Sequence, residues 1–403
     1  MTGNSSFSLP IIILNDINFW VTMKFFWVFT LLFSLLVVSG QSQNIQNRNK
    51  KKLLKQITPY LSPPAGYQNA MGNFRSPLKF YSGETVKTPA DWEQRRKEIL
   101  DRWHEMMGPW PELITDQELE IIETTKRDNF TQHKVQFSWL PGEQTTGYLL
   151  IPDKAGKKPA VITVFYEPET AIGMGKPFRD FAYQLAKRGF VTLSIGTAES
   201  SQNKTYSLYY PSIENVQAEP LSMLAYAAAN AWNALAKEEE VDSTRIGIAG
   251  HSFGGKWAMF ASCLYEKFAC SAWSDPGIVF DETKGSAVNY WEPWYLGYYP
   301  PPWSNAWRKT GMTKDAKGLY PKLVRQGYDL HELHALMAPR PFLVSGGSSD
   351  PPERWKALNH TIAVNKLLGY KNRVAMTNRP EHSPNEESNE QLYTFFEYFL
   401  GNE

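Results

Sequence analysis

The segment Gly250-His251-Ser252-Phe253-Gly254 has the pattern G-x-S-x-G, which can present a serine as a nucleophile. A short apolar stretch, 245–249, precedes it, and a helix-like stretch, 256–265, follows it. Strand, sharp turn and helix together form the context in which this pattern becomes a nucleophile elbow, and glycine at both ends lets the strand and helix pass without collision. We therefore expect Ser252 to be a nucleophile. The alternative is that its side chain only caps the helix.

A serine hydroxyl needs a neighbouring base at neutral pH, and the base needs an acid that orients it. Asp350 follows an apolar stretch at 341–344, and His382 lies in a loop before the last predicted helix. This order of serine, acid and histidine predicts a triad, because imidazole accepts and returns protons near neutral pH. Asp275, after the preceding predicted strand, is the alternative acid. If Asp350 holds the histidine, Asp275 could contact substrate instead.

An acyl-transfer site also needs donors for the oxyanion. We expect the backbone N–H of Phe253 to be one, and that of Tyr166 or Glu167, after the apolar stretch 160–165, to be the second. The usual glycine-rich H-G-G-G motif is absent from this loop.

The other histidines are interpreted as structural. His331 and His334 stand in H-E-L-H, which lacks the H-E-x-x-H spacing of zinc sites and has no evident third ligand. His360 falls inside a predicted helix and is expected to point away from the site. The spacing of these histidines therefore predicts no metal site.

The pattern of elements around these residues predicts an α/β fold. A helix beginning at Thr88-Pro89 ends before Gly108-Pro109. Strand-like segments of period two then lead into alternating strands and helices, which indicate a mostly parallel central sheet with flanking helices. The expected divisions are an upstream extension, a signal peptide, a flexible leader with an N-terminal helical section, and a catalytic domain with an aromatic-rich insertion: 1–22, 23–40, 41–117 and 118–403, with the insertion at about 276–340.

The charge of the chain and its predicted export signal bear on its partners and its location. A formal net charge of +1 gives no reason to expect nucleic acid. The charged start at Met23, the apolar run that follows and small residues near 40 predict a signal peptide, and hence a secreted or periplasmic protein with no stable membrane span after cleavage. An uncleaved anchor is the alternative. In an oxidising compartment Cys263 and Cys270 could pair, or both could be buried thiols.

From Glu118 to the C-terminus these residues resemble the α/β-hydrolase superfamily, and within it the dienelactone-hydrolase and acetyl-xylan-esterase-like branches. The spacing of Gly250, Ser252, Gly255 and Lys256 is similar to the G-C-S-R-x-G-K motif of glucuronoyl esterases, and 331–341 resembles the segment before their acid strand. The resemblance implies a serine esterase without metal or cofactor, often acting on plant or algal polysaccharides. Here His251 replaces the cysteine of that motif, and Phe253 replaces the arginine that assists the oxyanion in that family.

The insertion at about 276–340 is rich in rings that could stack on pyranose sugars. Candidate substrate contacts are Trp291, Trp294 and Trp303, together with Lys256, which could bind a substrate carboxylate. The alternatives are that the rings pack the insertion onto the domain and that the lysine is merely solvated.

We expect a secreted serine carboxylic-ester hydrolase that removes acetyl or uronoyl groups from carbohydrate through an acyl-enzyme on Ser252. A prolyl-oligopeptidase-like peptidase is an alternative, although the segment before Glu118 is too short for that family's propeller. A catalytically inactive, glycan-binding scaffold is another. All three residue types of a triad being present favours the enzyme.

Overall fold

The computed structural model describes residues 1–3, 48–197, 208–212, 214–281, 290–292, 295–298 and 317–401. The chain divides into two compact units, Met1–Lys52 with Glu403 and Leu53–Asn402, and the description that follows concerns the second. The predicted signal peptide, 23–40, lies outside the described residues, as do Trp294 and Trp303. Their predicted roles stay predictions.

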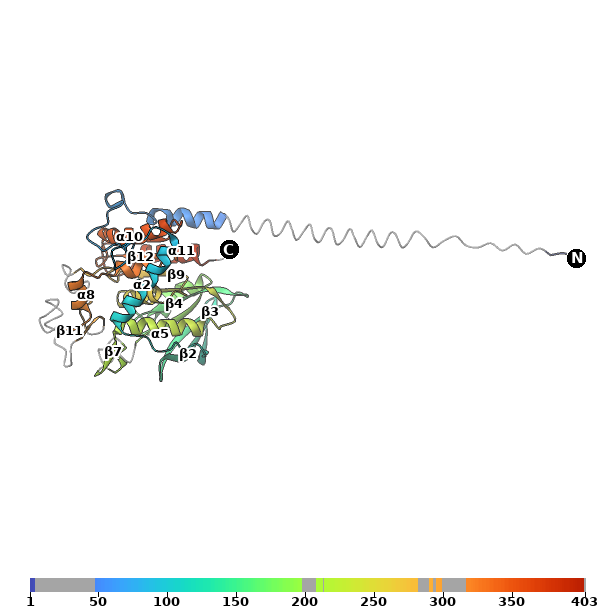
Figure 1. Ribbon diagram of the computed structural model, residues 1–403. Helices are drawn as coiled ribbons and strands as arrows, with labels where there is room; N and C mark the ends of the chain where they lie inside the picture. Colours follow the sequence, from blue (N-terminus) through green and yellow to red (C-terminus); the bar gives the residue numbers. More distant parts are fainter. Residues whose placement is uncertain are drawn as a thin grey trace. The chain divides into compact units, whose positions relative to one another are not determined.

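The described residues form a sheet of nine strands in the order β1-β2-β3-β5-β4-β8-β9-β12-β13 (Figure 1). Antiparallel pairing joins β1, β2, β3 and β5, and parallel pairing joins the strands from β5 to β13. This confirms the predicted α/β fold with a mostly parallel sheet. The strands are β1 Glu120–Arg127, β2 Phe130–Leu140, β3 Glu143–Pro152, β4 Lys158–Val164, β5 Val191–Ile195, β8 Val241–His251, β9 Cys270–Ser274, β12 Phe342–Gly346 and β13 Val374–Asn378.

Helices cover both faces of the sheet because its central strands are apolar on both sides. In β4, Ala160, Ile162 and Val164 join the core that includes α5, α6 and α10, whereas Val161 joins the core that includes α3 and α11. Alternate residues of one strand thus point to opposite faces. These helices are α3 Phe181–Lys187, α5 Pro220–Leu235, α6 Phe253–Leu264, α10 Trp355–Leu367 and α11 Glu386–Phe399.

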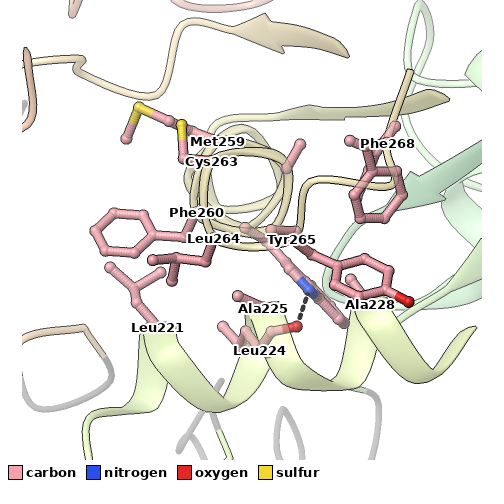
Figure 2. Packing of buried hydrophobic residues seen from close by; sticks show 14 of the residues in the cluster. Leu221, Leu224, Ala225, Ala228, Met259, Phe260, Cys263, Leu264, Tyr265 and Phe268 are labelled. Atoms are coloured by element: carbon pink, nitrogen blue, oxygen red, sulfur yellow. Dashed lines mark hydrogen bonds between the residues drawn. The ribbon is translucent and has the colours of Figure 1, made fainter. Parts of the chain in front are cut away.

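Close packing of α5 against α6 fixes the helix that follows the elbow. Figure 2 shows Leu221, Leu224 and Ala225 of α5 facing the side chains of α6, among them Phe260. Small residues in α5 let the two helices approach, and the Trp257 indole donates a hydrogen bond to the Leu224 carbonyl at 2.6 Å, the dashed line in Figure 2. Every residue of α6 is buried, so packing holds the helix that follows the elbow.

The N-terminal section begins earlier than the sequence suggested. Residues 53–57, at the start of this unit, are helical, and Ile57 is fully buried, so the prediction of a flexible leader was wrong for this part. Apolar burial outweighs its basic composition. The predicted helix is α2, Pro89–Met107, and it starts with a capping box between Thr88 and Asp91.

Short elements complete the described fold: η1 Thr58–Tyr60, η2 Ala65–Tyr67, the π-helix η3 Thr170–Met174, β6 Tyr210–Pro211, β7 Val216–Ala218, β10 Gly297–Tyr298, β11 Lys317–Gly318, α8 Tyr320–Gln326, α9 His331–Ala335 and η5 Pro352–Arg354. Cys263 and Cys270 are both buried free thiols, which answers the question left open by the sequence. None of the helices in the described ranges has the length and apolar character that crossing a membrane requires.

Candidate active site

Ser252 stands on a strained turn between β8 and α6. Its backbone has φ 59° and ψ −113°, a conformation that serine rarely adopts. A Cβ on Gly254 would lie 1.9 Å from the Val164 carbonyl oxygen, and one on Gly250 would lie 2.2 Å from the Gly254 oxygen. Glycine is required at both positions, and the strand-turn-helix context expected of the G-x-S-x-G pattern is present.

His382 links this serine to a carboxylate. Its Nε2 lies 2.8 Å from the Ser252 Oγ, and its Nδ1 lies 2.6 Å from the Asp275 Oδ2. Because an ionised carboxylate only accepts, Asp275 favours the tautomer with the proton on Nδ1, which leaves Nε2 free to accept the serine proton. The His382 side chain is 41% exposed whereas that of Asp275 is fully buried, so the proton relay opens to solvent at one end.

The expectation that Asp350 orients the histidine was wrong, and the alternative acid, Asp275, makes this contact. Both Asp350 carboxylate oxygens accept backbone N–H groups, from Gly277 at 2.7 Å and Ile278 at 2.6 Å. Its own amide donates to Asp275 Oδ1 at 2.9 Å. Asp350 therefore faces the turn that carries Asp275, and not the imidazole. Burial, and then the charge of Asp275, raise the pKa of Asp350 to about 6.

Asp275 itself is held by several donors. Gly347 N and Ser349 N donate to its carboxylate at 2.6 and 3.1 Å, besides the amide of Asp350. Its backbone φ of 49° lies in the left-handed region, directly after β9 ends. A carboxylate that accepts this many N–H groups is fixed in direction, which orients the imidazole in turn.

Arg379, which was not predicted from the sequence, holds the loop that carries His382. Its guanidinium donates to the backbone oxygens of His382 at 2.7 Å, Ser383 at 2.8 Å and Ser345 at 2.9 Å. It also donates to the Ser274 Oγ at 3.3 Å. The arginine thus ties the histidine loop to the ends of β12 and β9. Only its position three residues before the histidine could have pointed to it.

His251 places a second imidazole next to that of His382. Its ring centroid lies 4.8 Å from that of His382, and its Nδ1 lies 3.1 Å from the Ser274 Oγ. Burial lowers the pKa of His251 well below its usual value, and the charges of His382, Arg179 and Arg379 lower it further. His251 is therefore neutral near pH 7, and adds no positive charge beside the ring of His382.

The residues expected to supply the oxyanion donors lie in two neighbouring segments, the start of α6 and the loop after β4. Phe253 is the first residue of α6, so its N–H has no acceptor within the helix. Its ring stacks on that of Tyr166, with centroids 4.6 Å apart and planes 12° apart. The Tyr166 carbonyl accepts from Thr197 N at 2.6 Å, which fixes the loop after β4, and Glu167 follows with its side chain exposed.

Two of the expected substrate contacts are buried in protein. The Lys256 ammonium donates to the Pro276 carbonyl and lies 4.6 Å from the centre of the Tyr290 ring. Burial lowers its pKa to about 8. The Trp291 side chain is 2% exposed and its ring contacts that of Tyr320. In the described structure, both side chains are therefore packed against protein.

Side chains of the H-E-L-H segment contact other protein groups. His331 Nε2 contacts the Arg75 carbonyl, and Glu332 accepts a hydrogen bond from the Tyr81 hydroxyl at 3.0 Å. His360 Nε2 contacts the Met71 carbonyl at 2.9 Å. Within the described ranges, no group of three or more His, Cys, Asp or Glu side chains could hold a metal ion.

The family comparison agrees with this geometry. Residues 145–274, which run from β3 to the end of β9, match the dienelactone hydrolase family. Esterase EstD of Thermotoga maritima is 26% identical over 160 residues, which are 38% of this chain and 35% of EstD. The chain thus spans about a third of the length of that relative.

Solved structures share the fold over most of the chain. A glucuronoyl esterase from Solibacter usitatus superposes with a TM-score of 0.62 at 19% identity, covering 82% of this chain and 98% of that one. A family 15 carbohydrate esterase, a glucuronoyl esterase from Caldicellulosiruptor kristjansonii, gives 0.59 at 21% identity, covering 84% and 93%. Both confirm the fold expected from the sequence. Residues 145–274 are therefore similar to the dienelactone hydrolase family, and the described chain has the α/β-hydrolase fold of these solved structures.

Proposed function

We propose that the protein hydrolyses carboxylic esters of carbohydrate through an acyl-enzyme on Ser252. The observation that carries the proposal is the continuous contact from the Ser252 Oγ through His382 to Asp275 on a nucleophile elbow. A serine, a histidine and a buried carboxylate in this geometry perform acyl transfer on several unrelated folds.

In the acylation step, the Ser252 Oγ attacks the ester carbonyl carbon while His382 Nε2 accepts its proton. Asp275 stabilises the resulting imidazolium through the hydrogen bond on Nδ1. The oxyanion is bound by the N–H of Phe253 and one from the loop at Tyr166 and Glu167, each donor contributing about 3 kcal/mol. The C–O bond then breaks, and the alcohol leaves with the proton from Nε2.

Deacylation repeats these steps with water. His382 accepts a proton from the water, whose oxygen attacks the acyl carbon, and the carboxylic acid and the free Ser252 hydroxyl are released. The exposure of the histidine side chain gives water access to this position. No metal or cofactor is needed for either half of the reaction.

Carbohydrate esters are the proposed substrates for two reasons. The solved structures that share the fold include glucuronoyl esterases, and EstD is an esterase. The elbow also retains Gly255 and Lys256 at the spacing of the glucuronoyl-esterase motif. Acetyl and uronoyl esters therefore head the panel of substrates. We also propose that 23–40 is a signal peptide and that the mature enzyme acts outside the cytoplasm.

The test is a panel of acetyl xylan, glucuronoyl esters, feruloyl esters and 4-nitrophenyl acetate, assayed with the wild type and Ser252→Ala. We expect hydrolysis of at least one carbohydrate ester, a fall in kcat of about 10⁶-fold in the variant, and labelling of the wild type alone by a fluorophosphonate. Equal turnover by both proteins would refute the nucleophile. Turnover of 4-nitrophenyl acetate with no activity on any sugar ester would refute the substrate class.

A further inference from the structure

The loop between β4 and α3 borders the candidate nucleophile. Val164, the last residue of β4, pairs with Gly250 of the elbow. Because α3 follows a parallel strand and returns across the sheet, its first residues lie at the same carboxyl edge as the loop that precedes it. Residues 166–180 therefore lie beside Ser252 at the edge where ligands bind in such sheets.

Both ends of this loop are anchored. At its start, the Pro168 carbonyl accepts a hydrogen bond from the Ser194 Oγ at 2.6 Å. At its end, the Phe178 carbonyl accepts from the Asn389 Nδ2 at 2.9 Å. Asn389 is 5% exposed and lies in the first turns of α11, the helix that follows the His382 loop. This hydrogen bond thus fixes the end of the loop relative to α11, the helix that follows the His382 loop.

The loop is strained and carries exposed apolar side chains. Phe178 has a φ of 63°, a region that bulky residues enter only when the surrounding structure holds them there. Its side chain is 45% exposed, and that of Met174, at the end of the π-helix, is 69% exposed. Strained backbone and π-helical turns concentrate at functional sites. The loop therefore has the character of a binding surface.

Arg179 comes directly after the strained residue. It is half-buried, and its charge interacts with the phenol of Tyr166, in the same loop, and with the imidazole of His251 in the elbow. Burial lowers the pKa of Arg179, the Tyr166 phenol partly offsets this, and no carboxylate or hydrogen bond of a described residue does so. Arg379 and Lys256, the other cations nearby, already donate to backbone oxygens.

We propose that Arg179 is a specificity-determining residue that binds a carboxylate carried by the ester substrate, while Phe178 and Met174 contact the adjoining apolar part. The inference rests on the proposed function, since it needs Ser252 to be the nucleophile. Guanidinium binds carboxylate through two parallel hydrogen bonds, and a partly desolvated arginine without a protein partner gains most from such a ligand.

Two matched substrate pairs test this proposal. Mono-4-nitrophenyl succinate and 4-nitrophenyl succinamate carry an anionic or a neutral group on the acyl side, and 4-acetoxybenzoate and 4-acetoxybenzamide do so on the alcohol side. We expect Arg179→Gln to lower kcat/KM about 10- to 100-fold for the anionic member of one pair, and to leave the neutral members within about 2-fold. The affected pair identifies the side of the ester that carries the carboxylate.

The control is Lys176→Gln, which removes the same charge from an exposed position in the same loop. It is expected to change no ratio, and Arg179→Lys is expected to keep part of the preference for the anion. Equal losses on anionic and neutral esters, or no loss on either, would overturn the proposal. Failure of the proposed function would look different, because Ser252→Ala would then hydrolyse the neutral esters as fast as the wild type.

Discussion

Two neighbouring parallel strands, β9 and β12, each lead into a turn that holds a buried aspartate, yet only one of these carboxylates contacts the histidine. Asp275 accepts from His382 at 2.6 Å, whereas Asp350 accepts from the backbone of Gly277 and Ile278. Burial is the same for both side chains. The two carboxylates differ in the direction in which they point. Asp275 has a left-handed backbone conformation immediately after its strand, whereas Asp350 lies four residues beyond the end of β12.

The two turns nevertheless depend on each other. The Asp350 amide donates to Asp275, and its carboxylate holds the backbone just after Asp275. One aspartate therefore orients the base, and the other orients the turn that presents the first. Replacing each in turn should produce losses of very different size.

The largest effect is expected from Asp275→Asn. The amide offers a donor where Nδ1–H needs an acceptor, so the imidazole adopts the wrong tautomer, and kcat on 4-nitrophenyl acetate should fall about 10³- to 10⁴-fold with little change in KM. Steady-state kinetics beside an unchanged thermal melting curve would check this. A larger loss from Asp350→Asn than from Asp275→Asn would reverse the comparison.

A smaller loss is expected from Arg379→Met, because the residue positions the His382 loop without touching substrate. We expect kcat to fall about 10- to 100-fold, the size typical of losing a positioning contact at a catalytic group. Arg379→Lys, which keeps one charged donor, should recover part of the rate. Wild-type kcat in the methionine variant would show that the loop needs no such support.

Asp350→Asn should cost less still. Asparagine keeps one acceptor for the turn that follows Asp275, so kcat should fall by about 10-fold or less, with the pH profile of kcat/KM unchanged. That profile would shift if Asp350 were part of the proton relay. Kinetics from pH 5 to 9 distinguish the two cases.

The smallest effect concerns stability. Because the pKa of Asp350 is raised to about 6 in the fold, above its ordinary value, ionisation is less favourable in the folded state. The stability that this group contributes is thus fully present below pH 4 and is lost as pH rises through 6. The unfolding free energy of the wild type, relative to Asp350→Asn, should fall over that range by at most about 3 kcal/mol. Parallel curves from urea titrations at pH 4 to 7 would contradict this.

Local patterns in the sequence were enough to predict the elbow, the parallel sheet and the order of Ser252 and His382. They could not assign the acid, since both aspartates follow strands and only the backbone angle at Asp275 separates them. Lys256 and Trp291 were candidates for substrate contact because of their type, yet tertiary packing buries both. Arg379 carries no motif, because its partners are backbone oxygens.

The two cysteines, 263 and 270, have a practical consequence. Both thiols are buried and unpaired, and burial raises the pKa of each, so neither forms a reactive thiolate while the protein is folded. Neither cysteine is part of a disulfide in the described fold. Alkylation of these thiols therefore reports opening of the core around α6 and β9. Its rate measures the frequency of local unfolding beneath the candidate nucleophile.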